Sequence, residues 1–242
     1  MAAAFTNTVF GLLRTFILLA AAREAGGLVG GYDPEQIATY VWLGQGLIGT
    51  VMLWGWTDLG DRIRTGDVVA DLLRPIHPVT SYLAIDLGRA AHAALSRFAV
   101  PLAVGVVLFD LHQPRRLGSY ALFVVSVPLA VIVCFGCRYL VNASAFWLLD
   151  LRGVSLVWTF SSAAFTGLVV PLSFFPGWFA ALLWATPFPS ILQAPLDVIV
   201  ERRSVLVTLA IVAGQAVWAV GLLLLCRHVQ RRAERKLVIQ GG

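Results

Sequence analysis

Two adjoining stretches decide the fold: residues 36–56 read QIATYVWLGQGLIGTVMLWGW, and residues 58–78 read DLGDRIRTGDVVADLLRPIHP. The first stretch holds no charged side chain over its 21 residues, which is long enough for a helix to cross the hydrocarbon core of a bilayer. The second holds four aspartates and three arginines. The abrupt change predicts a membrane-spanning helix followed by a polar loop outside the bilayer.

The composition of the whole chain agrees with this interpretation. The 242 residues are 59% hydrophobic and 13% charged, with a mean hydropathy of +0.82, whereas a soluble domain has about 25% charged residues. The apolar runs are also far longer than the roughly 10-residue alternating segments of barrel strands. The sequence therefore predicts an all-α integral membrane protein and excludes a water-soluble fold.

The apolar runs predict a single transmembrane domain over residues 1–242 with six crossings. These crossings are placed at about 5–22, 36–56, 86–109, 119–148, 154–173 and 204–226. The 44 residues from 153 to 196 carry no charge, but they contain five prolines, which break helices. A broken, Pro-rich element, re-entrant or lying on the outer surface, is therefore expected over 174–200.

Basic residues predict the orientation in the membrane. The tail 227–242 begins RHVQRRAERK, and positively charged segments favour the cytoplasmic side. This places both termini and the polar segment 57–81 in the cytoplasm. The pair Arg115–Arg116, on the predicted outer side, is an exception to the rule. Because the excess positive charge sits in the tail, it indicates membrane orientation, and no nucleic acid partner is expected.

Two arginines lie within apolar runs, Arg14 and Arg138. A centred arginine costs about 2.5–3.5 kcal/mol on insertion scales, so each needs a partner or an aqueous cavity. Arg138 is open to two interpretations: snorkelling or structural pairing, and a role in a substrate path.

Polar uncharged residues offer a further candidate path. Thr159, Ser162 and Thr166 fall near one helical face, and Gln45 and Thr50 are the polar positions of the second crossing. Such residues serve helix packing in membranes, or they line a translocation path between the second and fifth crossings.

Sequence motifs for catalysis are missing. A P-loop needs a lysine after its glycine-rich turn, but the only lysine, Lys236, precedes Leu237. Neither HExxH nor GxSxG occurs. We therefore expect a non-enzymatic chain without a bound cofactor or metal; a membrane-embedded enzyme acting on lipid has little support.

Two segments resemble permease subunits of ATP-binding-cassette exporters of the ABC type-2 class. They are ADLLRPIHPVTSYLAIDLGRA (70–90) and GLVVPLSFFPGWFAALLWATPFPSILQAPLDVI (167–199). The resemblance implies a bacterial inner-membrane protein that exports a lipophilic or amphiphilic substrate. It also implies separate nucleotide-binding ATPase subunits, which carry ATP and Mg, and a second permease, identical or different.

The same resemblance assigns the charged segment to coupling, as the part that docks on the ATPase. The residues expected to act there are Arg62, Arg64, Asp67, Asp71, Arg74 and Pro75. Charges at such an interface set register and partner choice more than affinity. Two alternatives stay open: a solvated loop whose charges avoid the membrane, and, for the whole chain, a secondary carrier or channel that needs no ATPase.

Overall fold

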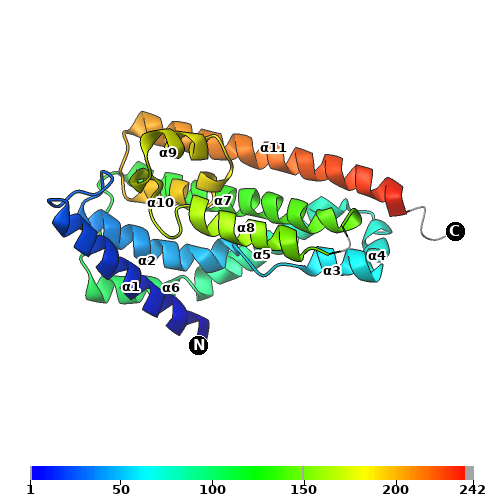
Figure 1. Ribbon diagram of the computed structural model, residues 1–242, viewed down its shortest axis with the longest axis horizontal. Coiled ribbons are helices and arrows are strands. Elements are labelled where there is room, and N and C mark those ends of the chain that lie inside the picture. The colour runs from blue at the N-terminus through cyan, green and yellow to red at the C-terminus, as the bar shows by residue number, and fades with distance from the viewer. Residues whose placement is uncertain (1, 149, 238–242) are drawn as a thin grey trace.

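The structure is a computed structural model that describes residues 2–148 and 150–237, and over these residues it contains helices but no named strand. The chain passes back and forth along the long axis of the molecule (Figure 1). The prediction of an all-α fold is confirmed. Residues 238–242 of the predicted basic tail lie outside the described residues.

The α-helices of the described residues differ widely in length. They are α1 (Ala2–Glu24), α2 (Pro34–Val51), α3 (Asp58–Thr65), α4 (Val68–Leu72), α5 (Pro78–Ser96), α6 (Ala99–Leu108), α7 (Leu117–Ala143), α8 (Arg152–Phe165), α9 (Gly177–Trp184), α10 (Gln193–Ile199) and α11 (Val205–Leu237). Short 3-10 turns, η1 (Ser144–Phe146), η2 (Leu172–Phe174) and η3 (Phe188–Ser190), join some of them.

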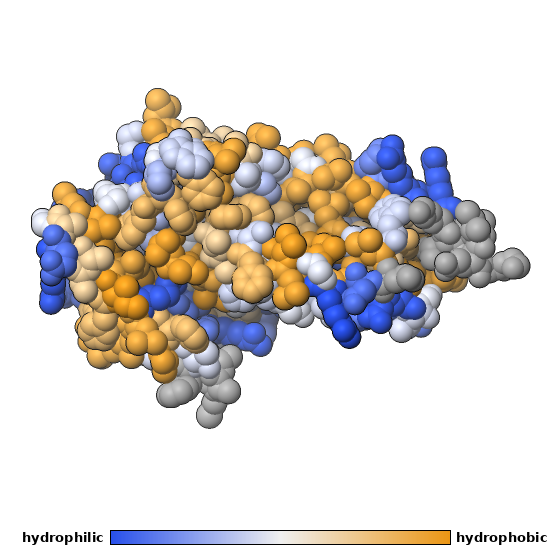
Figure 2. Space-filling view, in the orientation of Figure 1, coloured by the Kyte–Doolittle hydropathy of each residue, from blue (hydrophilic) through white to orange (hydrophobic). Residues whose placement is uncertain are grey.

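Among residues 2–148 and 150–237, three helical segments are long and apolar enough to cross a membrane: Pro78–Leu108, Leu117–Phe146 and Val205–Arg235. Hydrophobic residues cover most of the face in Figure 2, and hydrophilic groups gather toward the two ends and at one place along the lower edge. The chain is therefore a multi-pass membrane protein. The count of six crossings stays a prediction.

The third predicted crossing, 86–109, corresponds to two helices rather than one. α5 begins at Pro78, and the helix is interrupted at Arg97 and Phe98 before α6. Pro101 lacks the N–H that would bond to the carbonyl of Arg97, so the helical ladder loses a rung at this point. α5 and α6 each pack against α2.

The fifth predicted crossing, 154–173, contains a shorter helix than expected. α8 ends at Phe165, and Gly167 follows with a φ of +83°. Glycine is the residue that most readily adopts this left-handed conformation just past a helix end. The helix therefore stops eight residues before residue 173, the predicted end of the crossing.

Residues 172–199 form η2, α9, η3 and α10 in place of a long helix. Every residue of α10 is buried, and the helix contacts α7, α11 and α2. The prolines account for the breaks. Whether this element is re-entrant or lies on the outer surface stays a prediction.

The molecule has two distinct ends. α3, α4 and the C-terminal part of α11 lie at one end, which we call the α3–α4 end (Figure 1). α9, α10 and the turn between α1 and α2 lie toward the other, the α9–α10 end (Figure 1). Between them α7 packs against α11, α10, α5 and α2, and its buried residues join the main hydrophobic core.

Candidate functional site

An ion pair clamps α3 to α4 within the predicted coupling segment. Arg62 donates from Nε to Oδ2 of Asp71 at 2.8 Å and from Nη2 to Oδ1 at 3.0 Å. The hydroxyl of Tyr82, on α5, donates to the same carboxylate at 2.7 Å. The hydrogen bond that Arg62 donates to Asp71 raises the pKa of Arg62. One carboxylate therefore joins three helices.

The same segment is packed onto α7. Leu59 and Val68 are fully buried, in a cluster with Phe135 and other α7 residues. The N–H of Gly60 donates to Oδ1 of Asn142 at 3.0 Å, and the amide of Asn142 donates to the carbonyl just before α3. A side chain at Gly60 would collide with this contact. The segment is a fixed part of the fold rather than a free loop.

Apolar side chains cover the outer face of the segment. Val69 is 50% exposed, Leu73 82% and Ile76 56%. Sequence reasoning missed these residues, because it weighed the charges alone; the signal was the pair of leucines before Arg74 in DLLRP. An exposed apolar group with a charged rim is typical of a protein-binding surface.

The charged residues predicted for coupling separate into two sets. Arg62 and Asp71 bind one another, and Asp67 accepts a hydrogen bond from the neighbouring Thr65 at 2.7 Å. Arg64, Arg74 and Pro75 are exposed, and so is Asp67 in spite of its hydrogen bond. The pair Arg62 and Asp71 holds the segment in shape, and the exposed residues lie close in sequence to the exposed apolar side chains.

A buried charge network lies deeper, where α2, α5 and α7 meet. Arg138 donates to Asp86 at 2.7 Å, and Arg89 donates to the other oxygen of Asp86 at 2.8 Å. The side chains of Arg138 and Asp86 are 2% and 7% exposed. The structure therefore gives Arg138 the structural partner that one interpretation required; its role in a substrate path stays a prediction.

This network also closes the C-terminal end of α2. Arg89 donates to the carbonyls of Gly49 at 3.0 Å and Thr50 at 2.9 Å. The last carbonyls of a helix have no partner within it, and cations near them are favourable. Sequence reasoning did not connect these residues, although an embedded arginine and a lone aspartate between apolar runs each needed a partner.

The other embedded arginine uses the backbone. Arg14 donates from Nε to the carbonyl of Val169 at 3.2 Å. This contact attaches α1 to the irregular chain that follows α8.

The residues predicted for a path do not converge on one cavity. Gln45 lines a cavity of about 360 Å³ between α1, α2 and α5. Thr50 lines a separate, apolar groove of about 450 Å³ between α2, α5 and α7. The hydroxyls of α8 bond within their helix: Thr159 donates to the carbonyl of Ser155 at 2.8 Å, and Thr166 to that of Ser162 at 2.6 Å.

Ser162 also makes a contact outside its helix. It accepts a hydrogen bond from the indole of Trp54 at 2.9 Å. These α8 contacts are typical of helix packing. A path role for the predicted residues stays a prediction.

A second polar cluster, missed from sequence, holds the α9–α10 end. Asp197 accepts hydrogen bonds from the hydroxyl of Tyr32 and, at 2.8 Å, from the amide of Gln193, and Arg202 lies 3.6 Å away. Gln193 accepts from Tyr40 at 2.8 Å. The signal was Asp197 itself, the first charge after 44 uncharged residues. The cluster fixes α10 against α2 and the turn before it.

The described side chains make packing contacts, hydrogen bonds and ion pairs. Among residues 2–148 and 150–237 there is no group of three or more His, Cys, Asp or Glu side chains that could hold a metal ion. The three cysteines are free, and two of them are buried.

The chain matches a known protein family. Residues 9–241 match the family described as ABC-2 family transporter protein. Neither the curated proteins nor the solved structures compared with the chain gave a match. Members of this family are membrane subunits, generally without catalytic activity, that pair with ATPase subunits. Because the match extends over almost the whole chain, the protein belongs to the ABC-2 family of transporter proteins.

Proposed function

We propose that this chain is the permease subunit of an ATP-driven exporter and that its α3–α4 end docks on a separate nucleotide-binding subunit. One observation carries the proposal: a short, rigidly held segment presents exposed apolar side chains, Val69, Leu73 and Ile76, at one end of a membrane protein. Burial of such side chains in an interface is favourable, because it removes apolar surface from water.

The contacts of the segment supply a route for force. Closure of the ATPase subunits on ATP pushes on α3 and α4. Asn142 passes the displacement to α7, and Tyr82, through its hydrogen bond to Asp71, passes it to α5. α5 in turn holds the end of α2 through Arg89. Movement at the docking surface therefore reaches three of the helices that form the core.

The membrane arrangement in this proposal has six crossings and cytoplasmic termini in a bacterial inner membrane. Two permeases, the same chain or different chains, pair with two ATPase subunits that hold ATP and Mg. A lipophilic or amphiphilic substrate passes outward between the permeases, and the Pro-rich element 174–200 covers the outer end. The residues assigned to the path are Gln45, Thr50, Arg138, Thr159, Ser162 and Thr166.

The test uses an apolar docking residue and a matched control. The protein is affinity-tagged in its native host, and the bound nucleotide-binding subunit and its ATP turnover are measured. Leu73→Glu places a charge on the docking face and is expected to reduce co-purified ATPase about tenfold or more, as loss of a central interface contact does. Leu28→Glu, at an exposed leucine of the opposite end, is expected to leave it unchanged.

Three results would contradict the proposal. If Leu73→Glu and Leu28→Glu recovered equal amounts of ATPase, the α3–α4 end would not be the docking surface. Transport in vesicles that follows a proton gradient and ignores ATP would favour the secondary carrier or channel instead. Turnover of lipid by the chain alone would favour an enzyme.

A further inference from the structure

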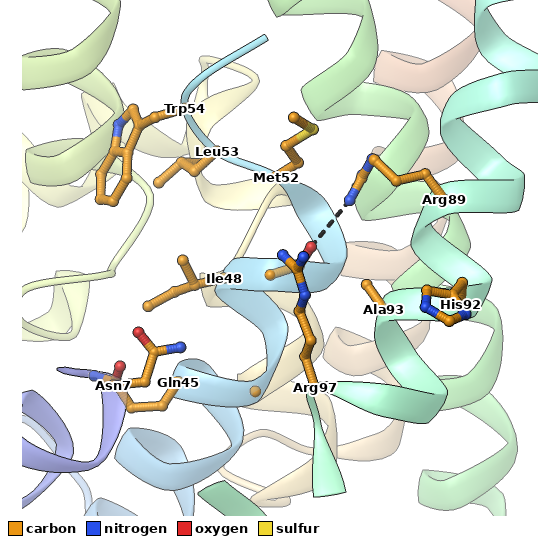
Figure 3. A pocket seen from close by; sticks show the side chains of 12 residues that line it. Asn7, Gln45, Ile48, Met52, Leu53, Trp54, Arg89, His92, Ala93 and Arg97 are labelled. Carbon is orange, nitrogen blue, oxygen red and sulfur yellow. Dashed lines mark hydrogen bonds between the residues drawn. The ribbon is translucent and has the colours of Figure 1, made fainter. Parts of the chain in front are cut away.

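A cavity with a mixed polar and apolar lining lies beside the C-terminal end of α2. It has a volume of about 360 Å³ and lies between α1, α2 and α5. Figure 3 shows Asn7 and Gln45 on one side of it and Arg89, His92 and Arg97 on the other. The cavity therefore combines neutral hydrogen-bonding groups with three basic side chains.

The balance of charge around the cavity is positive. No carboxylate is among the described residues that line it. Asp86 forms an ion pair with Arg89 of the lining, but it also forms one with Arg138. In the part of the chain that the structure describes, the side chain of Arg97 makes no hydrogen bond or ion pair. A cation without an internal partner is available for an anion from outside.

Arg89 is held in place at the mouth of the cavity. Its guanidinium is fixed by Asp86 and by the carbonyls of Gly49 and Thr50, and Figure 3 shows the bond to the end of α2. Arg97 extends past the same helix end toward Arg89 (Figure 3). An anion bound between the two would meet one pre-oriented and one adjustable cation.

The depth of the cavity points to the lipid headgroups. α2 has 18 residues, which at about 1.5 Å per residue make a helix about 27 Å long, close to the roughly 30 Å thickness of the hydrocarbon core. The cavity sits at its C-terminal end, beside the exposed Trp54. Tryptophan is enriched at this level of a membrane. In the predicted arrangement, in which α2 crosses the membrane, the cavity faces the headgroups of the leaflet on the α3–α4 side.

We propose that this cavity binds the phosphate headgroup of an anionic lipid from that leaflet. Arg97 and His92 contact the phosphate, and Asn7 and Gln45 bind the polar part of the headgroup. The apolar lining, which includes Ile48 and Met52, accepts the first part of the acyl chain. The lipid is a resident ligand rather than the exported substrate, and its binding does not depend on the proposed ATPase coupling.

Lipid binding to the purified protein tests this directly. Native mass spectrometry measures retention of phosphatidylglycerol and phosphatidylcholine at equal concentrations. Wild type is expected to prefer phosphatidylglycerol. Because a basic residue near an anionic surface is worth about fivefold in affinity, Arg97→Gln is expected to weaken phosphatidylglycerol binding about fivefold and Arg97→Gln/His92→Gln more. Phosphatidylcholine binding stays unchanged.

A matched control separates a site from general surface charge. Arg152→Gln also removes one positive charge, from a side chain that is 90% exposed, and it is expected to keep the wild-type preference. Thermal unfolding of each variant in detergent verifies that the fold is kept. Arg89 is left intact, because its loss would open the end of α2.

Three outcomes overturn the proposal. The first is an unchanged lipid preference in the double variant. The second is an equal loss in Arg152→Gln, which would indicate non-specific attraction. The third is displacement of bound phosphatidylglycerol by the same concentration of inorganic phosphate, which would identify a free anion as the ligand. None of these readouts involves ATP, so they stand apart from the test of the docking surface.

Discussion

α4 and α10 are short helices at opposite ends of the molecule, and the same three residue types anchor both. Asp71 of α4 is bound by Arg62 and Tyr82, and Asp197 of α10 is bound by Arg202 and Tyr32. Their surroundings differ. The side chain of Asp71 is 11% exposed and that of its arginine 37%, against 1% and 11% at Asp197.

The difference shows how burial decides the use of one chemical arrangement. At α4 water reaches the pair, so its contribution to stability is small, and the helix presents an apolar face outward. At α10 every residue is buried, so each polar group depends on its protein partner. The first arrangement suits a surface that meets another protein, and the second suits a fixed joint in the core.

The largest effect is expected from removal of Asp197, the buried anchor of α10. Asp197→Ala removes the acceptor of Tyr32 and Gln193 and leaves Arg202 with less compensation, so we expect a loss of about 3–5 kcal/mol in unfolding free energy. Asp71→Ala is expected to cost about 1 kcal/mol, because Arg62 can turn to water. Thermal unfolding in detergent measures both; equal losses would show that burial does not distinguish the two anchors.

The second effect tests how closely α10 is packed. Gly167 has a positive φ, and a Cβ there would run into Tyr40 and Gln193. Gly167→Ala is expected to cost about 2–4 kcal/mol from strain and displaced buried hydrogen bonds. Gly26→Ala shares the positive φ but has open space around it, and about 1 kcal/mol is expected. Similar melting temperatures for the two variants would mean that Tyr40 and Gln193 can move away from a Cβ at position 167 at little cost in free energy.

The smallest effect concerns pH at Glu201, two residues after the end of α10. Burial disfavours the ionised form of Glu201 and would raise its pKa. Glu201 accepts hydrogen bonds from the hydroxyl of Ser119 and the N–H groups of Arg115 and Arg116. These bonds outweigh the effect of burial, so the pKa of Glu201 is lowered. A carboxylate with a lowered pKa stabilises the fold at neutral pH, and this contribution disappears as the pH falls through the lowered value.

Glu201→Gln should therefore lower the melting temperature slightly at neutral pH and converge with wild type in acid. Glu24→Gln, at an exposed glutamate, is the control and should run parallel to wild type at every pH. A gap between Glu201→Gln and wild type that persists into acid would exclude the carboxylate as the source of the effect.

Parts of this architecture follow from composition alone. The helical membrane class was predicted from long uncharged runs and is confirmed, and the family was predicted from residues 70–90 and 167–199 and is confirmed. The break at Arg97 was not predicted, although Pro101 carries the signal. The early end of α8 at Gly167 was missed in the same way, because proline was given more weight than glycine.

The candidate site was predicted as a charged segment with six named residues, but without their contacts. The sequence placed charge between residues 58 and 78, but it did not show that Arg62 and Asp71 bind each other, nor that Leu73 faces outward. These are questions of side-chain direction, which depends on how three helices pack. The cavity beside the end of α2 was equally hidden, since its lining comes from three separate helices.

The sequence by itself determined that the protein lies in a membrane and that its local structure is helical. Long apolar runs are stable in lipid, where a helix bonds all of its own backbone N–H and C=O groups. The charged segments between these runs are stable in water. The membrane class and the helices therefore follow from local composition. Tertiary structure alone decided which buried charges meet. Arg138 and Asp86 are 52 positions apart, and Tyr32 and Asp197 are 165 apart. Burial makes such pairs necessary, but only the packing of the helices selects the partner.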